Sequence, residues 1–203
     1  MRKLLVTTFM TLDGVMQAPG GPEEDTNGAF AHGGWSVPFW NDDINEAMDR
    51  VMGRPFDLLL GRRTYDIFAG FWPTASEDQG AGPLNAATKY VASRGRPELS
   101  WDKSVLLEGD VASAVAELKE GDGPEIQVHG SADLLQTLLR HRLVDEFHLI
   151  TYPVVLGTGK RLFGEGVAPQ ALRRIEGRTS DNGVVIGTYV PTGDVATGTF
   201  APE

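Results

Sequence analysis

The sequence predicts an α/β fold in which helices pack on a largely parallel sheet that ends in an antiparallel hairpin or meander. Apolar, strand-like runs alternate with amphipathic helical segments from residue 3 to residue 143, and the connections between most of them are short. Three more strand-like segments follow residue 143 with no good helix between them. The alternation indicates parallel pairing, and the helix-free end indicates antiparallel pairing.

The composition is that of one globular domain. The chain has 203 residues, of which 41% are hydrophobic and 23% charged, so it can bury a sizeable core. Its net charge of −10 would repel a phosphodiester backbone, and we expect no nucleic-acid partner. The absence of cysteine excludes disulfides and thiolate metal sites, and it favours a reducing, cytoplasmic compartment. No apolar stretch approaches the length of a membrane span, and we expect neither a membrane nor a metal as a partner.

The first strand and a long loop open the chain. Residues 3–11 are rich in β-branched and aromatic types, which favour a strand. Residues 12–34 are rich in glycine, proline and acidic side chains, which indicates a loop. Long loops in compact domains are usually functional. Two interpretations of residues 13–40 stay open here: a lid that faces a substrate, or a disordered insertion at the surface.

The remaining elements follow from apolar periodicity and capping residues. Asn41 and Asp110 are placed to cap helices, the first of which ends at Met52. Further helices are expected at 62–71 and after His129, and a short helical turn is expected at 83–87. A polar loop is expected at 73–82. Strands are expected at 56–61, 88–93, 105–107, 125–129, 146–155, 171–176 and 184–190. The domain would then span residues 1–190, and residues 191–203 would form a loose tail.

Three predicted strand ends carry glycine, hydroxyl or arginine residues. They are Gly61-Arg62-Arg63-Thr64, Ser93-Arg94 and Gly130-Ser131. A helix N-terminus attracts anions through its free N–H groups, and arginines there oppose the helix dipole unless a polyanion is bound. Parallel strands end at one edge of a sheet, where ligands bind. Together the three turns favour a phosphate-bearing cofactor, although each arginine alone is equally well interpreted as a solvated surface charge.

Several motifs resemble the dihydrofolate reductase-like family. They are Thr11-Leu12-Asp13-Gly14, Leu60-Gly61-Arg62-Arg63-Thr64-Tyr65, Val128-His129-Gly130-Ser131, Leu143-Val144-Asp145-Glu146, and the run from Pro153 to Phe163. They occur in the family's order between about residue 2 and residue 190. The similarity is closer to the branch related to the C-terminal reductase domain of the bifunctional riboflavin biosynthesis protein. It implies a three-layer sandwich and an NADPH-dependent reductase that acts on a pterin-like or pyrimidine-like heterocycle.

The resemblance also implies which residues bind NADPH. The 2′-phosphate and the pyrophosphate would be held by Gly61, Arg62, Arg63, Thr64, Ser93, Arg94, Gly130, Ser131 and Ala132. Dihydrofolate reductases carry a glycine pair where this chain has His129-Gly130. His129 is interpreted as a core residue, with a contact on the nicotinamide side as the alternative.

The acid group and the substrate contacts are predicted from the same resemblance and from residue type. Asp13 is the candidate acid because the Leu-Asp-Gly motif stands out in the riboflavin-type branch, with Asp42 and Asp43 as alternatives on the following helix. Three aromatic residues at the end of the long loop can stack on a flat ring or anchor the loop in the core, and two cations can face a substrate anion. These five candidates are Trp35, Phe39, Trp40, Lys160 and Arg161.

Other functions are weighed against the reductase. A nucleotide- or flavin-binding module without turnover is the main alternative, because the cofactor motifs match the family better than the catalytic ones. A serine hydrolase using Ser131 is disfavoured, since the Gly-x-Ser-x-Gly spacing is missing. The cysteine-containing pattern of the zinc deaminase half of the bifunctional enzyme is missing too. A homodimer is expected because relatives in the riboflavin branch pair and the late strands leave an edge to cover.

Overall fold

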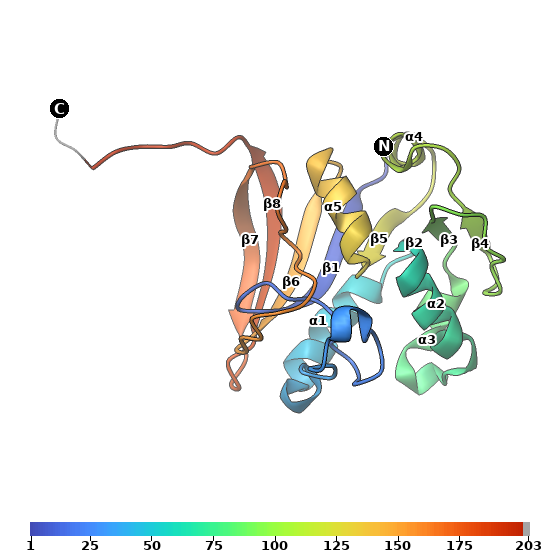
Figure 1. Ribbon diagram of the computed structural model, residues 1–203, viewed down its shortest axis with the longest axis horizontal. Helices are drawn as coiled ribbons and strands as arrows, with labels where there is room; N and C mark the ends of the chain where they lie inside the picture. Colours follow the sequence, from blue (N-terminus) through green and yellow to red (C-terminus); the bar gives the residue numbers. More distant parts are fainter. Residues whose placement is uncertain (201–203) are drawn as a thin grey trace.

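An eight-stranded sheet forms the centre of the domain in the computed structural model, which describes residues 1–200 (Figure 1). The strand order is β4-β3-β2-β5-β1-β6-β8-β7; the first six run parallel, β8 runs antiparallel to β6, and β7 runs antiparallel to β8. The strands are β1 Leu4–Thr11, β2 Phe56–Gly61, β3 Lys89–Ala92, β4 Ser104–Leu106, β5 Glu125–His129, β6 Glu146–Tyr152, β7 Ala171–Thr179 and β8 Val185–Gly193.

Helices cover both faces of the sheet and complete three layers. They are α1 Asp42–Met52, α2 Arg62–Phe71, α3 Ala81–Ala86, α4 Val111–Glu120 and α5 Ala132–Arg140, with short 3-10 turns in the loops. Side chains alternate between the faces along each strand. In β2, Leu59 packs in one core with leucines of α5, whereas Leu58 and Leu60 pack in another with Tyr65 of α2. Helices α2 and α5 therefore lie on opposite faces.

Local sequence explains where the helices begin. The Asn41 side chain accepts a hydrogen bond from the Ile44 N–H at 3.1 Å, and Asp42 and Asp43 complement the helix dipole in the first turn of α1. Asp110 caps α4 in the same way through the Ser113 N–H at 2.9 Å. In α1 the buried residues Ile44 and Val51 lie two turns apart, so one face of the helix packs on the sheet.

The structure confirms the predicted fold class, and most elements agree with prediction to within one or two residues. Four boundaries differ. Helix α3 begins at Ala81, inside the segment expected to be loop, and β6 ends at Tyr152, before residue 155. Strands β7 and β8 continue to Thr179 and Gly193, beyond residues 176 and 190. The residues after β8 extend away from the domain (Figure 1), and 201–203 lie outside the described residues. Within residues 1–200 no helix has the length and apolarity needed to cross a membrane.

The long segment between β1 and α1 is a packed loop rather than a loose insertion. Phe30 and Trp35 are 5% and 7% exposed and belong to a core with Tyr152 of β6. The Trp35 ring lies 5.3 Å from the Tyr152 ring, and its Nε1 donates to the Gln17 carbonyl at 2.8 Å. These contacts hold the loop over the carboxyl ends of the parallel strands.

Candidate active site

An open cleft of about 2030 Å³ lies at the carboxyl ends of β1, β2, β3 and β5. The chain leaves β2 and β5 toward opposite faces of the sheet, because α2 and α5 pack on different sides. Diverging connections of this kind open the crevice in which α/β sheets bind ligands. The cleft has room for a dinucleotide together with a second ring.

All nine residues predicted to bind the cofactor line this cleft. They are Gly61, Arg62, Arg63, Thr64, Ser93, Arg94, Gly130, Ser131 and Ala132. Three turns that are far apart in the sequence thus meet in one place, as their positions at parallel strand ends predict. Whether they bind a cofactor stays a prediction.

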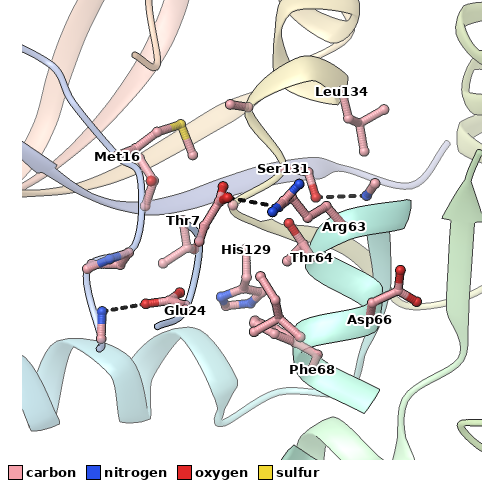
Figure 2. A pocket seen from close by; sticks show the side chains of 18 of the residues that line it. Thr7, Met16, Glu24, Arg63, Thr64, Asp66, Phe68, His129, Ser131 and Leu134 are labelled. Atoms are coloured by element: carbon pink, nitrogen blue, oxygen red, sulfur yellow. Dashed lines mark hydrogen bonds and ion pairs between the residues drawn. The ribbon is translucent and has the colours of Figure 1, made fainter. Parts of the chain in front are cut away.

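A hydrogen bond joins two of these turns. The Ser131 Oγ accepts from the Gly61 N–H at 2.7 Å (Figure 2). The turns approach so closely that a Cβ at Gly61 would lie 3.0 Å from the Ser131 Cβ, which explains the glycine. Gly130 and Ser131 have φ values of 82° and 73°, in the left-handed region that glycine adopts readily and serine does not. The backbone is therefore held in a constrained conformation at this point.

The helices that begin at these turns direct free backbone donors into the cleft. Neither Gly61 at the start of α2 nor Ser131 at the start of α5 provides a side-chain cap, so the N–H groups of each first turn are available to a ligand. Because the helix dipole adds a partial positive charge at each terminus, the two turns together favour an anion with two or more phosphate groups.

Two arginines add positive charge at this end of the cleft. The Arg62 Nε binds the Asp66 carboxylate at 2.7 Å, but its Nη1 is buried and has no partner among the described residues. The Arg94 side chain is 97% exposed, and its nearest carboxylate oxygen, on Asp133, is 4.0 Å away. Both guanidinium groups retain donors that match the geometry of a phosphate.

The other end of the cleft is closed by the long loop. Asp25 binds the Arg63 Nε at 2.8 Å and the Lys160 Nζ at 2.6 Å, so it connects the loop to α2 and to the segment after β6. Trp40 also lines the cleft, and its ring lies edge-on to Phe9 of β1 at 5.7 Å. The resulting wall combines apolar surface with a small number of charged groups, as is typical of ligand pockets.

Glu24 presents a carboxyl group to this part of the cleft (Figure 2). It accepts a hydrogen bond from the Gly20 N–H at 2.6 Å. Burial raises the pKa of Glu24, and the charge of Asp25 acts in the same direction, while backbone hydrogen bonds from Gly20 and Gly21 oppose the shift. Glu24 therefore retains its proton to a higher pH than an exposed glutamate.

His129 lies on the floor of the cleft, at the end of β5 (Figure 2). Its Nε2 is 2.8 Å from the Gln127 Oε1. Burial, with a smaller contribution from nearby His148, lowers the pKa of His129 to about 4. The ring is neutral at pH 7. His129 thus lines the cleft from a desolvated position, and whether it acts only in the core or also contacts the nicotinamide side stays a prediction.

Comparison with known proteins identifies the family. A family model described as the RibD C-terminal domain matches residues 2–186. The chain belongs to the RibD C-terminal domain family. This is a reductase-type family, as the resemblance in the motifs implies. Among curated proteins, the uncharacterized protein YyaP of Bacillus subtilis (strain 168) is 27% identical over 192 residues, which cover 93% of this chain and 94% of YyaP.

Solved structures with the same fold include the following two proteins. One, provisionally named for riboflavin biosynthesis, is from Shewanella sp. PV-4; it has a TM-score of 0.71 at 22% identity and covers 94% of this chain and 99% of its own. The other is dihydrofolate reductase from Enterococcus faecalis in complex with NADP(H) and RAB-propyl, with a TM-score of 0.58 at 14% identity and coverages of 93% and 96%. At these identities the likeness concerns the fold.

Within this RibD-type domain, Asp13 lies outside the residues that line the cleft. Its carboxylate accepts hydrogen bonds from the Thr11 hydroxyl at 2.5 Å and from the Gly157 and Leu156 N–H groups at 2.8 and 3.2 Å. These bonds, that of Thr11 foremost, lower the pKa of Asp13 to about 2. A group that is ionised at neutral pH cannot donate a proton there, so the geometry assigns Asp13 to holding two loops together.

The alternative acids on α1 are also outside the lining. Asp42 is exposed in the first turn, and Asp43 binds Arg178 at 3.2 Å. The carboxylate of α1 that does line the cleft is Asp49, one turn beyond Asn45. Neither α1 alternative is brought to the cleft.

The predicted substrate contacts divide into two groups. Trp40 and Lys160 line the cleft. Trp35 and Phe39 instead pack on Tyr152, which agrees with the alternative that these aromatic residues anchor the loop in the core. Arg161 donates to the Asp13 and Gly157 carbonyls. The sequence reasoning missed Glu24 and Thr7. A run of acidic residues in the long loop was the available indication of Glu24, whereas nothing in the sequence distinguishes Thr7 from other strand threonines.

Proposed function

We propose that this chain is an NADPH-dependent reductase that transfers hydride to a pterin-like or pyrimidine-like heterocycle. The observation that carries the proposal is the meeting of three glycine-, hydroxyl- and arginine-bearing turns in one cleft with a second, partly apolar compartment beside them. A binding site for a phosphate-rich nucleotide and a site for a flat ring are then adjacent, as a hydride transfer requires.

The residues of the cofactor half fit such a molecule. The close approach of Gly61 and Ser131, the uncapped starts of α2 and α5 and the unpartnered Arg62 Nη1 all suit a pyrophosphate and a further phosphate. Bound NADPH would supply the hydride from its nicotinamide ring. The protein would hold the pyrophosphate at Gly130–Ala132 and the 2′-phosphate at Arg62 and Arg94.

Glu24 is the carboxyl group best placed to supply the proton. Reduction of a ring C=N bond adds hydride to the carbon and a proton to the nitrogen, so the substrate needs an acid on its own side of the cleft. Glu24 lines that side and has a raised pKa. This assignment replaces Asp13, which faces away from the cleft.

Calorimetric titration with NADPH, followed by absorbance assays of NADPH oxidation with a panel of dihydropterins and pyrimidines, tests the proposal. We expect micromolar or tighter binding and turnover with at least one ring system. Gly61→Val is the matched site-blocking control, because its side chain would enter the 3.0 Å contact with Ser131. Binding without oxidation of NADPH by any ring would favour the nucleotide-binding module, and no binding would overturn the cofactor assignment.

A further inference from the structure

We infer that Thr7 and His129 form a hydrogen-bonding floor that selects a ring carrying an N–H or amino group on the edge facing the sheet. Both residues line the cleft, from neighbouring parallel strands. The inference rests on the proposed function for the identity of the ring. The argument for the floor itself comes from the hydrogen bonds around the two side chains.

The tautomer of His129 is fixed by its neighbours. The Gln127 Nε2 donates to the Val51 carbonyl and to the Glu125 carboxylate, both at 2.7 Å, and these atoms can only accept. The Gln127 Oε1 is thereby turned toward His129, at 2.8 Å from Nε2. Because Oε1 accepts, the proton of the neutral ring resides on Nε2. The Nδ1 is left as an acceptor to which no described residue donates.

Thr7 supplies the second group of the floor. It is paired with His129 in the register of β1 and β5, so the two side chains lie next to each other on one face of the sheet. Thr7 is 3% exposed, and its Oγ1 has no hydrogen-bond partner among the described residues. A buried hydroxyl without a partner is unfavourable, and valine would fill the same space without that cost.

One edge of a ligand can supply hydrogen-bond partners to both the His129 Nδ1 and the Thr7 hydroxyl. The Nδ1 requires a donor, and the Thr7 hydroxyl can either donate or accept. An amidine-like or amide-like edge, with an N–H beside a second polar atom, satisfies both. A ring edge made of carbonyl oxygens alone would place a lone pair against Nδ1, and the site would disfavour it.

Two molecules in the cleft could present this chemistry. One is the heterocycle that accepts the hydride, and the other is the nicotinamide ring, whose carboxamide carries an NH₂ group. The shared requirement is an N–H donor directed at Nδ1. Pairs of ligands that differ in this donor separate the two sources.

Histidine ¹⁵N spectra of the wild-type protein test the floor without any turnover. We expect the free protein at pH 7 to show the Nε2–H tautomer at His129. Addition of 2,4-diaminopyrimidine should shift the Nδ1 resonance, whereas 2,4-dimethylpyrimidine should leave it unchanged. The Nδ1–H tautomer, or an Nδ1 resonance that neither 2,4-diaminopyrimidine nor NADP⁺ shifts, would overturn the inference.

Binding to variants provides the second test. His129→Phe and Thr7→Val should each weaken binding of 2,4-diaminopyrimidine by about tenfold and leave 2,4-dimethylpyrimidine unaffected. The matched control is His148→Phe. His148 is paired with Thr7 on its other side, and its Nε2 also contacts a neighbouring side chain, Glu146, but it does not line the cleft.

The same variants with NADP⁺ and its 3-acetylpyridine analogue, which lacks the NH₂ donor, test the cofactor as the source. A loss confined to NADP⁺ assigns the floor to the carboxamide, and a loss confined to the diaminopyrimidine assigns it to the substrate ring. If the variants lose the same affinity for both members of each ligand pair, or lose no affinity at all, the floor is refuted. Since the tautomer and these affinities do not depend on turnover, an inactive protein would count against the proposed reductase and not against the floor.

Discussion

At the scale of single residues, the charged groups of the cleft are divided between its two ends. Arg62 and Arg94 retain unused donors at the end formed by the strand turns, whereas Arg63 is already bound to Asp25 of the long loop. The two ends therefore attract different parts of a ligand. A phosphate is favoured at the first end, and a flat ring beside Trp40 at the second.

Arg62→Ala should weaken NADPH binding by roughly ten- to a hundredfold and leave NADH binding nearly unchanged. The two cofactors differ by the 2′-phosphate, and one charged hydrogen bond contributes on the order of 1.5–3 kcal/mol. Calorimetry with both cofactors measures the difference. Arg96→Ala is the matched control, because that exposed side chain pairs with Glu108 and does not line the cleft. Equal losses for NADPH and NADH would mean that Arg62 does not contact the 2′-phosphate.

Glu24→Gln should lower kcat by about 10²–10⁴-fold at neutral pH, the usual effect of removing a general acid. The wild-type rate should fall as the pH rises through the raised pKa of Glu24, since the proton is then lost, and the variant should show no such fall. Steady-state pH profiles provide the measurement.

Asp13→Asn is the control for Glu24. It should retain the rate and lose thermal stability, because the ionised Asp13 holds two loop N–H groups. A larger rate loss in Asp13→Asn than in Glu24→Gln would restore Asp13 as the acid.

At the scale of elements, the contact between the β2–α2 and β5–α5 turns determines the shape of the anion site. The Ser131 hydroxyl binds the Gly61 N–H, so the two turns hold each other at a fixed separation. The serine adopts a left-handed φ to do so. Ser131 thus makes two opposite contributions to the free energy of folding: its hydrogen bond is favourable and its backbone conformation is unfavourable.

Ser131→Ala should destabilise the protein by about 1–3 kcal/mol, because it removes the hydrogen bond and keeps the strained φ. Ser131→Gly loses the same bond but relieves the backbone, so it should be the more stable of the two variants. Urea unfolding of both proteins measures the difference. A glycine variant less stable than the alanine variant would show that the backbone conformation at 131 carries little strain.

Helices and strands that depend on local sequence patterns were predictable from the sequence, whereas contacts between distant segments were not. The strand ends at Gly61 and Gly130 follow from apolar runs interrupted by glycine, and these turns meet because parallel strands share an edge. The role of Asp13 depends on N–H groups of Leu156 and Gly157, more than 140 residues away. The Leu-Asp-Gly motif could not reveal these contacts, so the sequence alone predicts Asp13 as the acid.

At the scale of the whole molecule, the sheet face under α1 and α2 combines two apolar cores with a polar strip. The strip includes Thr7, Gln127, His129 and His148, which share a face through the pairing of β5, β1 and β6. A histidine held neutral in this strip links the stability of the entire domain to pH.

Acidification from pH 7 to pH 5 should reduce the free energy of unfolding through His129. The unfolded chain takes up the proton near pH 6.5, whereas the folded protein does so only near its pKa of about 4. Stability is therefore complete above pH 6.5 and decreases as the pH falls toward 4, by on the order of 2 kcal/mol at pH 5. Urea midpoints at the two pH values should differ less in His129→Phe than in the wild type. An unchanged difference would place the acid sensitivity elsewhere.

The anchoring of the long loop also affects how this protein can diversify. Phe30 and Trp35 fix the loop in the core, while the stretch from Pro19 to Asp25 faces the cleft. The cofactor turns belong to separate parts of the chain, at the ends of β2, β3 and β5. Asp25 is constrained because it binds Arg63 of the β2–α2 turn, and Glu24 because it is the proposed acid. Mutations at the other positions of this stretch can accumulate without disturbing the core anchors or the three turns. Descendants of one ancestral sequence can thus acquire new substrates while the phosphate-favouring end of the cleft stays the same.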